Sequence, residues 1–152
     1  RSSICACEYG DDKGIFGFGS AEVGNITNLV SNVGVVATDV SGVGTARGTP
    51  GACGYGYDKG IIGYGENVSA AVVSMTNLVS NAGVVASDTT GVGTSRNGLG
   101  ATQYAGDKAI FGYGTTGSLT AISNLVSNSG VVATDTSGVG TARYFLAACS
   151  YN

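Results

Sequence analysis

Short stretches of this chain alternate between apolar positions and polar or glycine positions, which is the pattern of extended strands. In KAIFGYG, residues 108–114, alternation puts Phe111 and Tyr113 on one face. Ile110 and Gly112 then lie on the other face. We expect the aromatic face to fill a core and the glycine to let the backbone of another sheet approach closely.

The residue types in and between these stretches indicate an all-β fold. Val, Ile, Tyr, Phe and Thr dominate the stretches, and Gly, Asn and Asp separate them. The chain has 27 glycines among its 152 residues, and each would cost a helix about 1 kcal/mol. The hydrophobic content of 43% is that of an ordinary folded domain, so we do not expect disorder.

The stretches belong to three repeat units and the start of a fourth. The units cover residues 1–46, 47–95 and 96–142, and residues 143–152 align with the start of each unit. The motif NLVSN occurs once in every unit, as do close variants of DKGIFGFG and GVVATD. In the third unit we expect four strands, at residues 99–104, 109–114, 122–127 and 130–135.

A four-stranded unit of this length is the size of a propeller blade. The pattern resembles kelch repeats, with an Arg, a small-apolar strand (LGATQY, LAACSY), an Asp-Lys turn and an apolar strand ending in glycines. Kelch units usually carry a paired glycine and a tryptophan, whereas this chain has Gly-aromatic-Gly and no tryptophan. It is even more similar to the DKAIFGYG…TNLVSN…GVVATD repeats of environmental and phage-like sequences of unassigned function. The resemblance implies three kelch-like blades plus one extra terminal strand, and no catalytic residue.

Charged residues follow the repeat. All seven basic residues occupy repeat positions, namely Arg1, Arg47, Arg96, Arg143, Lys13, Lys59 and Lys108. Six of the ten acidic residues do so as well, namely Asp12, Asp58, Asp107, Asp39, Asp88 and Asp135. A charge repeated in every unit indicates a structural role. We therefore expect the Asp carboxylates to cap turns and each Arg to pair with an acidic residue between units.

The segment 143–152, RYFLAACSYN, reads as the first strand of a blade without the remaining strands. Its backbone needs a partner, and a closed propeller needs about four to eight blades. We therefore predict an assembly strand that includes Arg143, Tyr144, Phe145, Leu146, Cys149 and Tyr151. It can insert into the next subunit and build a filament or a ring. Alternatively, two chains form one six-bladed propeller, the segment closes its own sheet beside the N-terminal strand, or the chain is a fragment of a longer array.

Cysteines and sequons add candidate modification sites. Cys7, Cys53 and Cys149 occupy the same repeat position, and Cys5 is additional. A disulfide from Cys149 to an N-terminal cysteine would join the end strands, although four cysteines allow three pairings and reduced, buried thiols are the alternative. Asn25 and Asn67 begin Asn-x-Ser/Thr triplets, which are glycosylation acceptors in secreted proteins.

Composition excludes several functions. The chain has no histidine, which excludes His-based zinc sites and Ser-His-Asp triads. We predict no metal, no cofactor and no enzymatic activity. The net charge is −3 and no basic patch is present, so we expect no nucleic-acid partner. No apolar run reaches about 18 residues, so we expect no membrane span.

The sequence favours a structural role. We expect a self-assembling homo-oligomeric subunit, joined head to tail through its terminal strands, in an extracellular filament or a virion-associated fibre at the virion surface. The alternative is a carbohydrate-binding, lectin-like propeller formed by closure or dimerisation. Aromatic rings can stack on sugars, and five tyrosines lie near predicted strand ends, namely Tyr55, Tyr57, Tyr64, Tyr104 and Tyr113.

Overall fold

The protein was analysed as a computed structural model, which describes residues 1–20 and 24–151. Within these residues there are strands but no helix, which confirms the predicted all-β class. The strands are β1 (Cys5–Tyr9), β2 (Lys13–Gly17), β3 (Thr27–Val30), β4 (Arg47–Gly48), β5 (Gly51–Tyr55), β6 (Lys59–Gly63), β7 (Glu66–Asn67), β8 (Thr76–Val79), β9 (Gly100–Tyr104), β10 (Lys108–Gly112) and β11 (Ser123–Val126).

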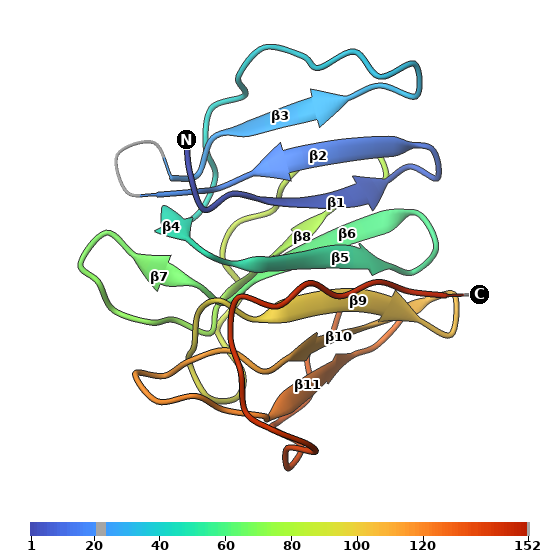
Figure 1. Cartoon of the computed structure of the whole chain (residues 1–152). Helices are drawn as coiled ribbons and strands as arrows, with labels where there is room; N and C mark the ends of the chain where they lie inside the picture. The colour runs from blue at the N-terminus through green and yellow to red at the C-terminus, as the bar shows by residue number, and fades with distance from the viewer. Residues whose placement is uncertain (21–23, 152) are drawn as a thin grey trace.

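Each repeat unit forms one small antiparallel sheet of three strands. The strand orders are β1-β2-β3, β5-β6-β8 and β9-β10-β11, and β4 pairs with β7 in a separate two-stranded ribbon. The first strands of the three sheets, β1, β5 and β9, run side by side, and the sheets spread from them like a fan (Figure 1). The turns between the first two strands of each sheet keep one register, with Tyr9 opposite Lys13 and Tyr55 opposite Lys59.

The predicted four strands per unit are not confirmed. The fourth segment of each unit meets the third strand only at isolated bridges, such as Val30 with Val36 and Val126 with Val132. Each segment turns back at a glycine with positive φ, for example Gly130 at 81°. Beyond that turn the segment runs antiparallel beside the third strand and bridges it again at the other end, as Val40 does with Thr27. Between the two bridges it has one residue more than the third strand, and this extra residue interrupts the ladder.

The predicted alternation in residues 108–114 is also wrong at its end. The strand β10 stops at Gly112, and Tyr113 has a φ of 64°. This left-handed residue interrupts the two-residue period, so Tyr113 lies on the same side as Ile110 and lines a pocket with it. Phe111 lies on the opposite side and is fully buried.

The cores lie between units rather than within them. We call the side of a sheet that is turned toward the next unit its forward face, and the other side its rear face. One core joins forward-face residues of the first unit to Ile62 and Val79 of the second. The other joins Ile61 and Tyr64 of the second unit to Phe111 of the third. Each three-stranded sheet is too small to bury its apolar side alone, so each unit depends on its neighbour.

Glycines at the start of the fourth segments make room for this packing. Gly83 has a φ of 77°, and a Cβ atom there would lie 3.0 Å from the Tyr9 ring and 2.8 Å from Leu29 Cδ2 of the preceding unit. Gly130 stands in the same relation to Tyr55 and Leu78. At the equivalent Gly34, with a φ of 79°, a Cβ would meet no described atom within 4 Å.

These glycines provide a test of inter-unit packing. Gly83→Ala and Gly34→Ala both place an alanine in the left-handed region, which costs about 1–2 kcal/mol. Only Gly83→Ala also overpacks the joint between units, which typically costs about 1–3 kcal/mol more. We expect the urea midpoint to fall further for Gly83→Ala. Equal midpoints for the two variants, measured at a protein concentration where the chain is monomeric, would contradict packing between units at this position.

Candidate functional site

An arginine at the start of the second unit holds the first joint together. Arg47 is fully buried, and its guanidinium lies 4.4 Å from the centre of the Phe18 ring in the first unit. Its Nε donates to the carbonyl of Tyr64 at 2.7 Å, and its Nη2 donates to Asn77 Oδ1 at 2.6 Å. Burial lowers the pKa of Arg47 to about 10, so the side chain stays charged at neutral pH. The arginine thus contacts both units at once.

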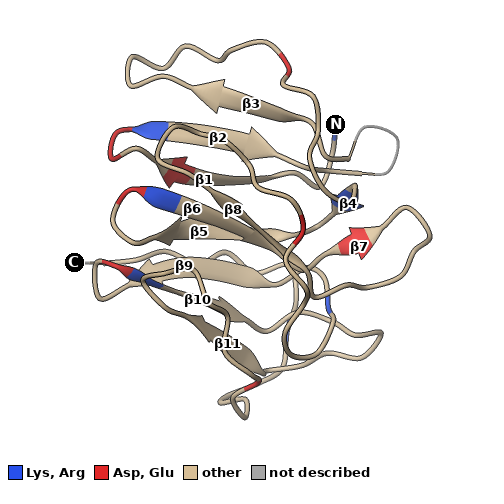
Figure 2. Ribbon diagram, turned by 180° about the vertical axis from the view of Figure 1, so that it is seen from behind, with Lys and Arg blue, Asp and Glu red and all other residues tan. Residues whose placement is uncertain are grey.

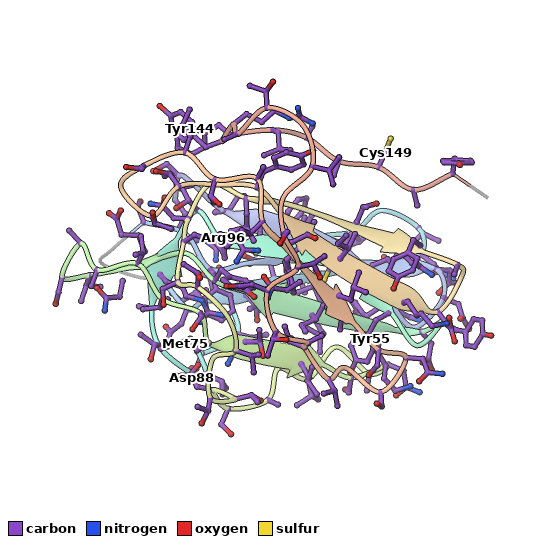
Figure 3. The ribbon with its side chains drawn as sticks, turned by 90° about the horizontal axis from the view of Figure 1, so that it is seen from below. Tyr55, Met75, Asp88, Arg96, Tyr144 and Cys149 are labelled. Carbon is purple, nitrogen blue, oxygen red and sulfur yellow. The ribbon has the colours of Figure 1, made fainter. Side chains whose placement is uncertain are left out.

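The second joint repeats the burial, the ring stacking and the Nε hydrogen bond of the first. Arg96 is also fully buried and lies 4.3 Å from the centre of the Tyr64 ring. Its Nε donates to the carbonyl of Tyr113 at 2.8 Å. Figure 3 shows Arg96 in the interior, between the sheets. Burial lowers the pKa of this arginine as well.

A threonine and an aspartate also connect neighbouring units. The backbone N–H and hydroxyl of Thr45 both donate to Asp88, at 2.9 and 2.7 Å. Thr94 donates to Asp135 in the same way at the next joint. Burial alone would raise the pKa of Asp88, but the hydrogen bonds from Thr45 and Asn77 outweigh burial and lower it.

The predicted pairing of Arg with an acidic residue between units is therefore corrected. Arg47 Nη1 does lie 3.8 Å from Asp88 Oδ1, but both residues belong to the second unit. The contacts of these side chains across the joint include the stacking of Arg47 on Phe18 and the hydrogen bonds from Thr45 to Asp88.

The Asp-Lys turns form a second repeated element. In each turn the Lys ammonium contacts the adjacent Asp, at 3.1 Å in the first unit and 2.9 Å in the other two. The same carboxylate accepts from the Asn that ends NLVSN, as in Asn81 to Asp58 at 3.0 Å. Figure 2 shows these charges gathered at one end of the sheets. All three turns are satisfied locally, which is consistent with a structural role.

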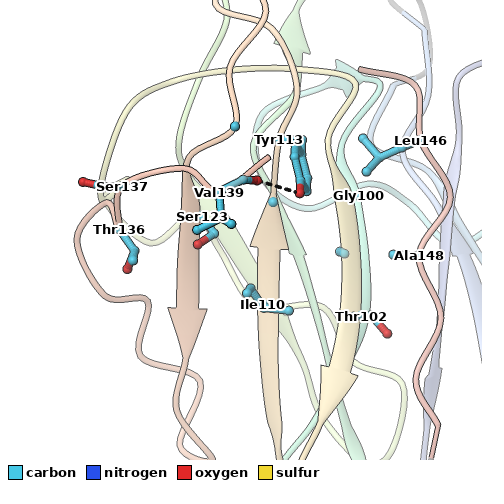
Figure 4. Close-up of a pocket in the computed structure, with 13 residues that line it drawn as sticks. Gly100, Thr102, Ile110, Tyr113, Ser123, Thr136, Ser137, Val139, Leu146 and Ala148 are labelled. Atoms are coloured by element: carbon cyan, nitrogen blue, oxygen red, sulfur yellow. Dashed lines mark hydrogen bonds between the residues drawn. The ribbon is translucent and has the colours of Figure 1, made fainter. Parts of the chain in front are cut away.

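Two faces of the fan remain uncovered by another unit. The rear face of the first unit exposes Phe16, whose accessible fraction is 38%, and Val36. The forward face of the third unit exposes Leu125. A pocket of about 280 Å³ lies on this forward face between β10 and the terminal segment, residues 143–152 (Figure 4).

The terminal segment runs beside β9 (Figure 1). Residue 152 lies outside the described residues, and the predicted strand is not formed over 143–151, because no described strand pairs with it. Arg143 lies 4.1 Å from the centre of the Tyr113 ring, and its carbonyl accepts from the N–H of Gly114 at 2.9 Å. A Cβ at Gly100 would lie 3.2 Å from Leu146 Cγ.

These contacts put the segment in the position beside β9 that the first strand of a unit takes beside the preceding unit. The N–H of Gly65 donates to the Arg96 carbonyl at 2.9 Å, as Gly114 does to Arg143. A Cβ at Gly51 would lie 3.3 Å from Leu99 Cγ, and Leu99 is the repeat equivalent of Leu146. The segment therefore packs on β9 as β9 packs on β5.

The predicted assembly residues differ in exposure. Tyr144 and Cys149 are exposed, Phe145 is 68% exposed and Tyr151 is 97% exposed. Leu146 is half-buried against β9. The aromatic side chains of the segment are therefore largely exposed.

All four cysteines, each among the described residues, are free in this structure. Burial raises the pKa of Cys5 and of Cys53 to about 12 and holds the pKa of Cys7 well above its ordinary value. Cys149 is exposed. Cys7, Cys53 and Cys149 line one shallow hollow across the first strands. The predicted disulfide stays a prediction.

The two candidate glycosylation sites are held by local hydrogen bonds. The side-chain amide of Asn25 donates to the carbonyl of Gly44 at 2.8 Å, and Asn67 Oδ1 accepts from the N–H of Ser69 at 3.0 Å. Both asparagines are half-buried, and their glycosylation stays a prediction.

Of the tyrosines considered for sugar stacking, Tyr55 and Tyr64 are buried between units. Their rings are therefore unavailable to a ligand. Tyr57 is exposed, and Tyr104 and Tyr113 are half-buried.

The described residues offer neither a metal site nor a membrane-spanning helix. They contain no group of three or more His, Cys, Asp or Glu side chains placed to hold a metal ion. They contain no helix long and apolar enough to cross a membrane.

A scan against models of known protein families found no match, and no curated protein matches the chain.

The arginines give a matched pair of variants. Arg47→Leu removes ring stacking worth about 1–2 kcal/mol and leaves buried acceptors unpaired at about 1–3 kcal/mol each. We expect the free energy of unfolding to fall by roughly 2–4 kcal/mol. Arg143→Leu removes the same stacking at an exposed position and should cost below about 1 kcal/mol. Similar losses for both variants, measured by urea unfolding of the monomeric chain, would show that Arg47 does not hold the joint.

The thiols can be counted by alkylation. A thiolate is the reactive species, so the raised pKa values of Cys5 and Cys53 predict slow reaction in the folded protein. We expect one fast thiol with iodoacetamide at pH 8, and Cys149→Ser should remove this fast phase. Two or more fast thiols in native protein would contradict the described burial.

Proposed function

We propose that the protein is a structural subunit that assembles head to tail into a filament or fibre. In this proposal, residues 143–152 of one copy become the first strand of a sheet whose other strands are β2 and β3 of the next copy. The partner is a second copy of the same chain. We place such an assembly outside the cell or at the surface of a virion, in keeping with the sequence analysis.

The main support comes from two incomplete arginine sites. Arg143 stacks on Tyr113, but its side chain donates no hydrogen bond to any residue that the structure describes. Arg1 hydrogen-bonds to the carbonyls of Phe18 and Ile26 and to Asn28 Oδ1. Among the described residues, no aromatic ring lies under Arg1 as Phe18 lies under Arg47.

The two sites complement each other. Arg47 combines a ring from the preceding unit with acceptors in its own unit. Arg143 already stacks on the Tyr113 ring. The first unit of a second copy carries the acceptors that bind Arg1. Arg143 in the place of Arg1 would gain both sets of contacts and become buried like Arg47.

Register supports the same pairing. In the chain itself, Cys5 lies opposite Gly17 and Tyr9 lies opposite Lys13. The repeat makes Ala147 equivalent to Cys5 and Tyr151 equivalent to Tyr9. The terminal segment can therefore add to β2 in the register of β1, by strand addition. Because the two strands are equivalent, β1 of the receiving copy must leave when the segment enters.

Deletion of residues 143–152 tests this proposal. The segment contributes no strand to the three sheets of its own chain, so we expect the deleted protein to remain folded by circular dichroism. We expect its oligomers to disappear in sedimentation velocity. A variant with the same ten residues in scrambled order is the matched control, and it should fail to assemble as well. Unchanged oligomers after deletion would contradict a role for the segment as the connector.

A further inference from the structure

The pocket on the forward face of the third unit has an apolar lining with a recognisable shape. Gly100, Gly112, Ile110 and Tyr113 line it. Leu146 of the terminal segment lies on the side of the pocket away from Ser123 (Figure 4). The Tyr113 hydroxyl donates to the carbonyl of Val139 at 3.1 Å, which fixes the ring at the pocket wall.

The two joints inside the chain show what fills this place. At the second joint, a Cβ at Gly63 would lie 3.0 Å from the Phe111 ring, so the missing side chain of Gly63 makes room for Phe111. The Phe111 ring packs edge-on against Tyr64, with 5.2 Å between ring centres. At the first joint, Ile62 fills the equivalent space beside Gly17.

At the third forward face the same space is empty. Gly112 is the repeat equivalent of Gly63 and Gly17, and a Cβ there would meet no described atom within 4 Å. Tyr113 is the equivalent of Tyr64, whose ring contacts Phe111. The pocket therefore corresponds to the space that one large apolar side chain of the following unit fills at the joints inside the chain.

The chain carries an unused side chain of the matching kind. The repeat makes Phe16 equivalent to Ile62 and Phe111. Phe16 stands on the rear face of the first unit and is 38% exposed, whereas Ile62 and Phe111 are almost fully buried.

We propose that Phe16 of a second copy inserts into the pocket formed by Gly100, Gly112 and Tyr113. The inference rests on the head-to-tail assembly proposed above and specifies its contact surface. It does not depend on which equivalent strand, β1 or the terminal segment, occupies the first position at the joint.

Polar groups on the two faces match as well. Asp39 accepts from Asn28 at 2.8 Å, as Asp88 accepts from Asn77 at 2.9 Å, so its carboxylate is held in the same way. Asp88 also accepts from Thr45 across the joint. Asp39 has no such donor among the described residues, and Thr141, the equivalent of Thr45, is exposed on the third unit.

The glycines at the start of the fourth segments also fit this contact. Gly83 receives Tyr9 and Leu29 of the preceding unit, whereas Gly34 meets no described atom. On the third unit, the repeat equivalent of Tyr9 is Tyr104, which is half-buried. The repeat equivalent of Leu29 is Leu125, which is exposed. A second copy would therefore bring together the same contacts that already close two joints in this chain.

Two variants test the contact from opposite sides. Gly112→Val fills the pocket and is compatible with the fold, because Gly112 has no positive φ and its added side chain begins in open space. Phe16→Ser removes the inserted ring from an exposed position. Loss of a buried Phe contact should weaken association about 10- to 100-fold for each variant. Val68→Ser, at an exposed apolar position in the second unit, is the control and should associate normally.

Mixing the variants gives the decisive readout by sedimentation velocity. A Gly112→Val chain keeps Phe16, and a Phe16→Ser chain keeps the pocket, so the mixture should form dimers that grow no further. Each variant alone should stay monomeric, with the circular dichroism and unfolding midpoint of the parent. Parent-like association of either variant, or a mixture that stays monomeric, would overturn the inference.

The result is separable from the role of the terminal segment. Assembly that requires residues 143–152 but ignores Phe16 and Gly112 would overturn this contact and leave the strand proposal standing. Assembly that survives the deletion but still requires Phe16 would support this contact and overturn the strand proposal. A parent chain that stays monomeric at all accessible concentrations would overturn both.

Discussion

The fold depends on an arginine buried between every pair of neighbouring units. A buried guanidinium is costly unless each side of it finds a partner. Arg47 and Arg96 meet this condition by stacking on a ring of the preceding unit and donating to carbonyls of their own unit. Neither unit alone supplies both the ring and the acceptors, so the buried arginine stabilises the contact between the two units.

The apolar side chains follow the same principle. Each unit is a three-stranded sheet with apolar residues on both faces, and both cores lie between units. A chain built in this way presents one rear face and one forward face that its own units do not cover. The exposed Phe16 at one end and the open pocket beside Gly112 at the other are the repeat equivalents of groups that meet at the joints inside the chain.

The sequence predicted the β class and the position of the Asp-Lys turns, because strand-forming residues, glycines and Asp-Lys pairs are local signals. It did not predict the face of Tyr113, because a positive φ after Gly112 cancels the strand period. The ring under Arg47 was missed for a different reason. Phe18 lies in another unit, and nothing in the linear pattern relates a charge to a ring across a joint. The repeated Arg together with the repeated Gly-aromatic-Gly was the available signal.

The central claim is that the chain joins to copies of itself in the way its own units join. Electron microscopy of the purified protein in negative stain, at increasing concentration, addresses this claim most directly. The account predicts linear or ring-shaped assemblies of stacked units that lengthen or accumulate with concentration. Isolated particles of single-chain size at every concentration would contradict it.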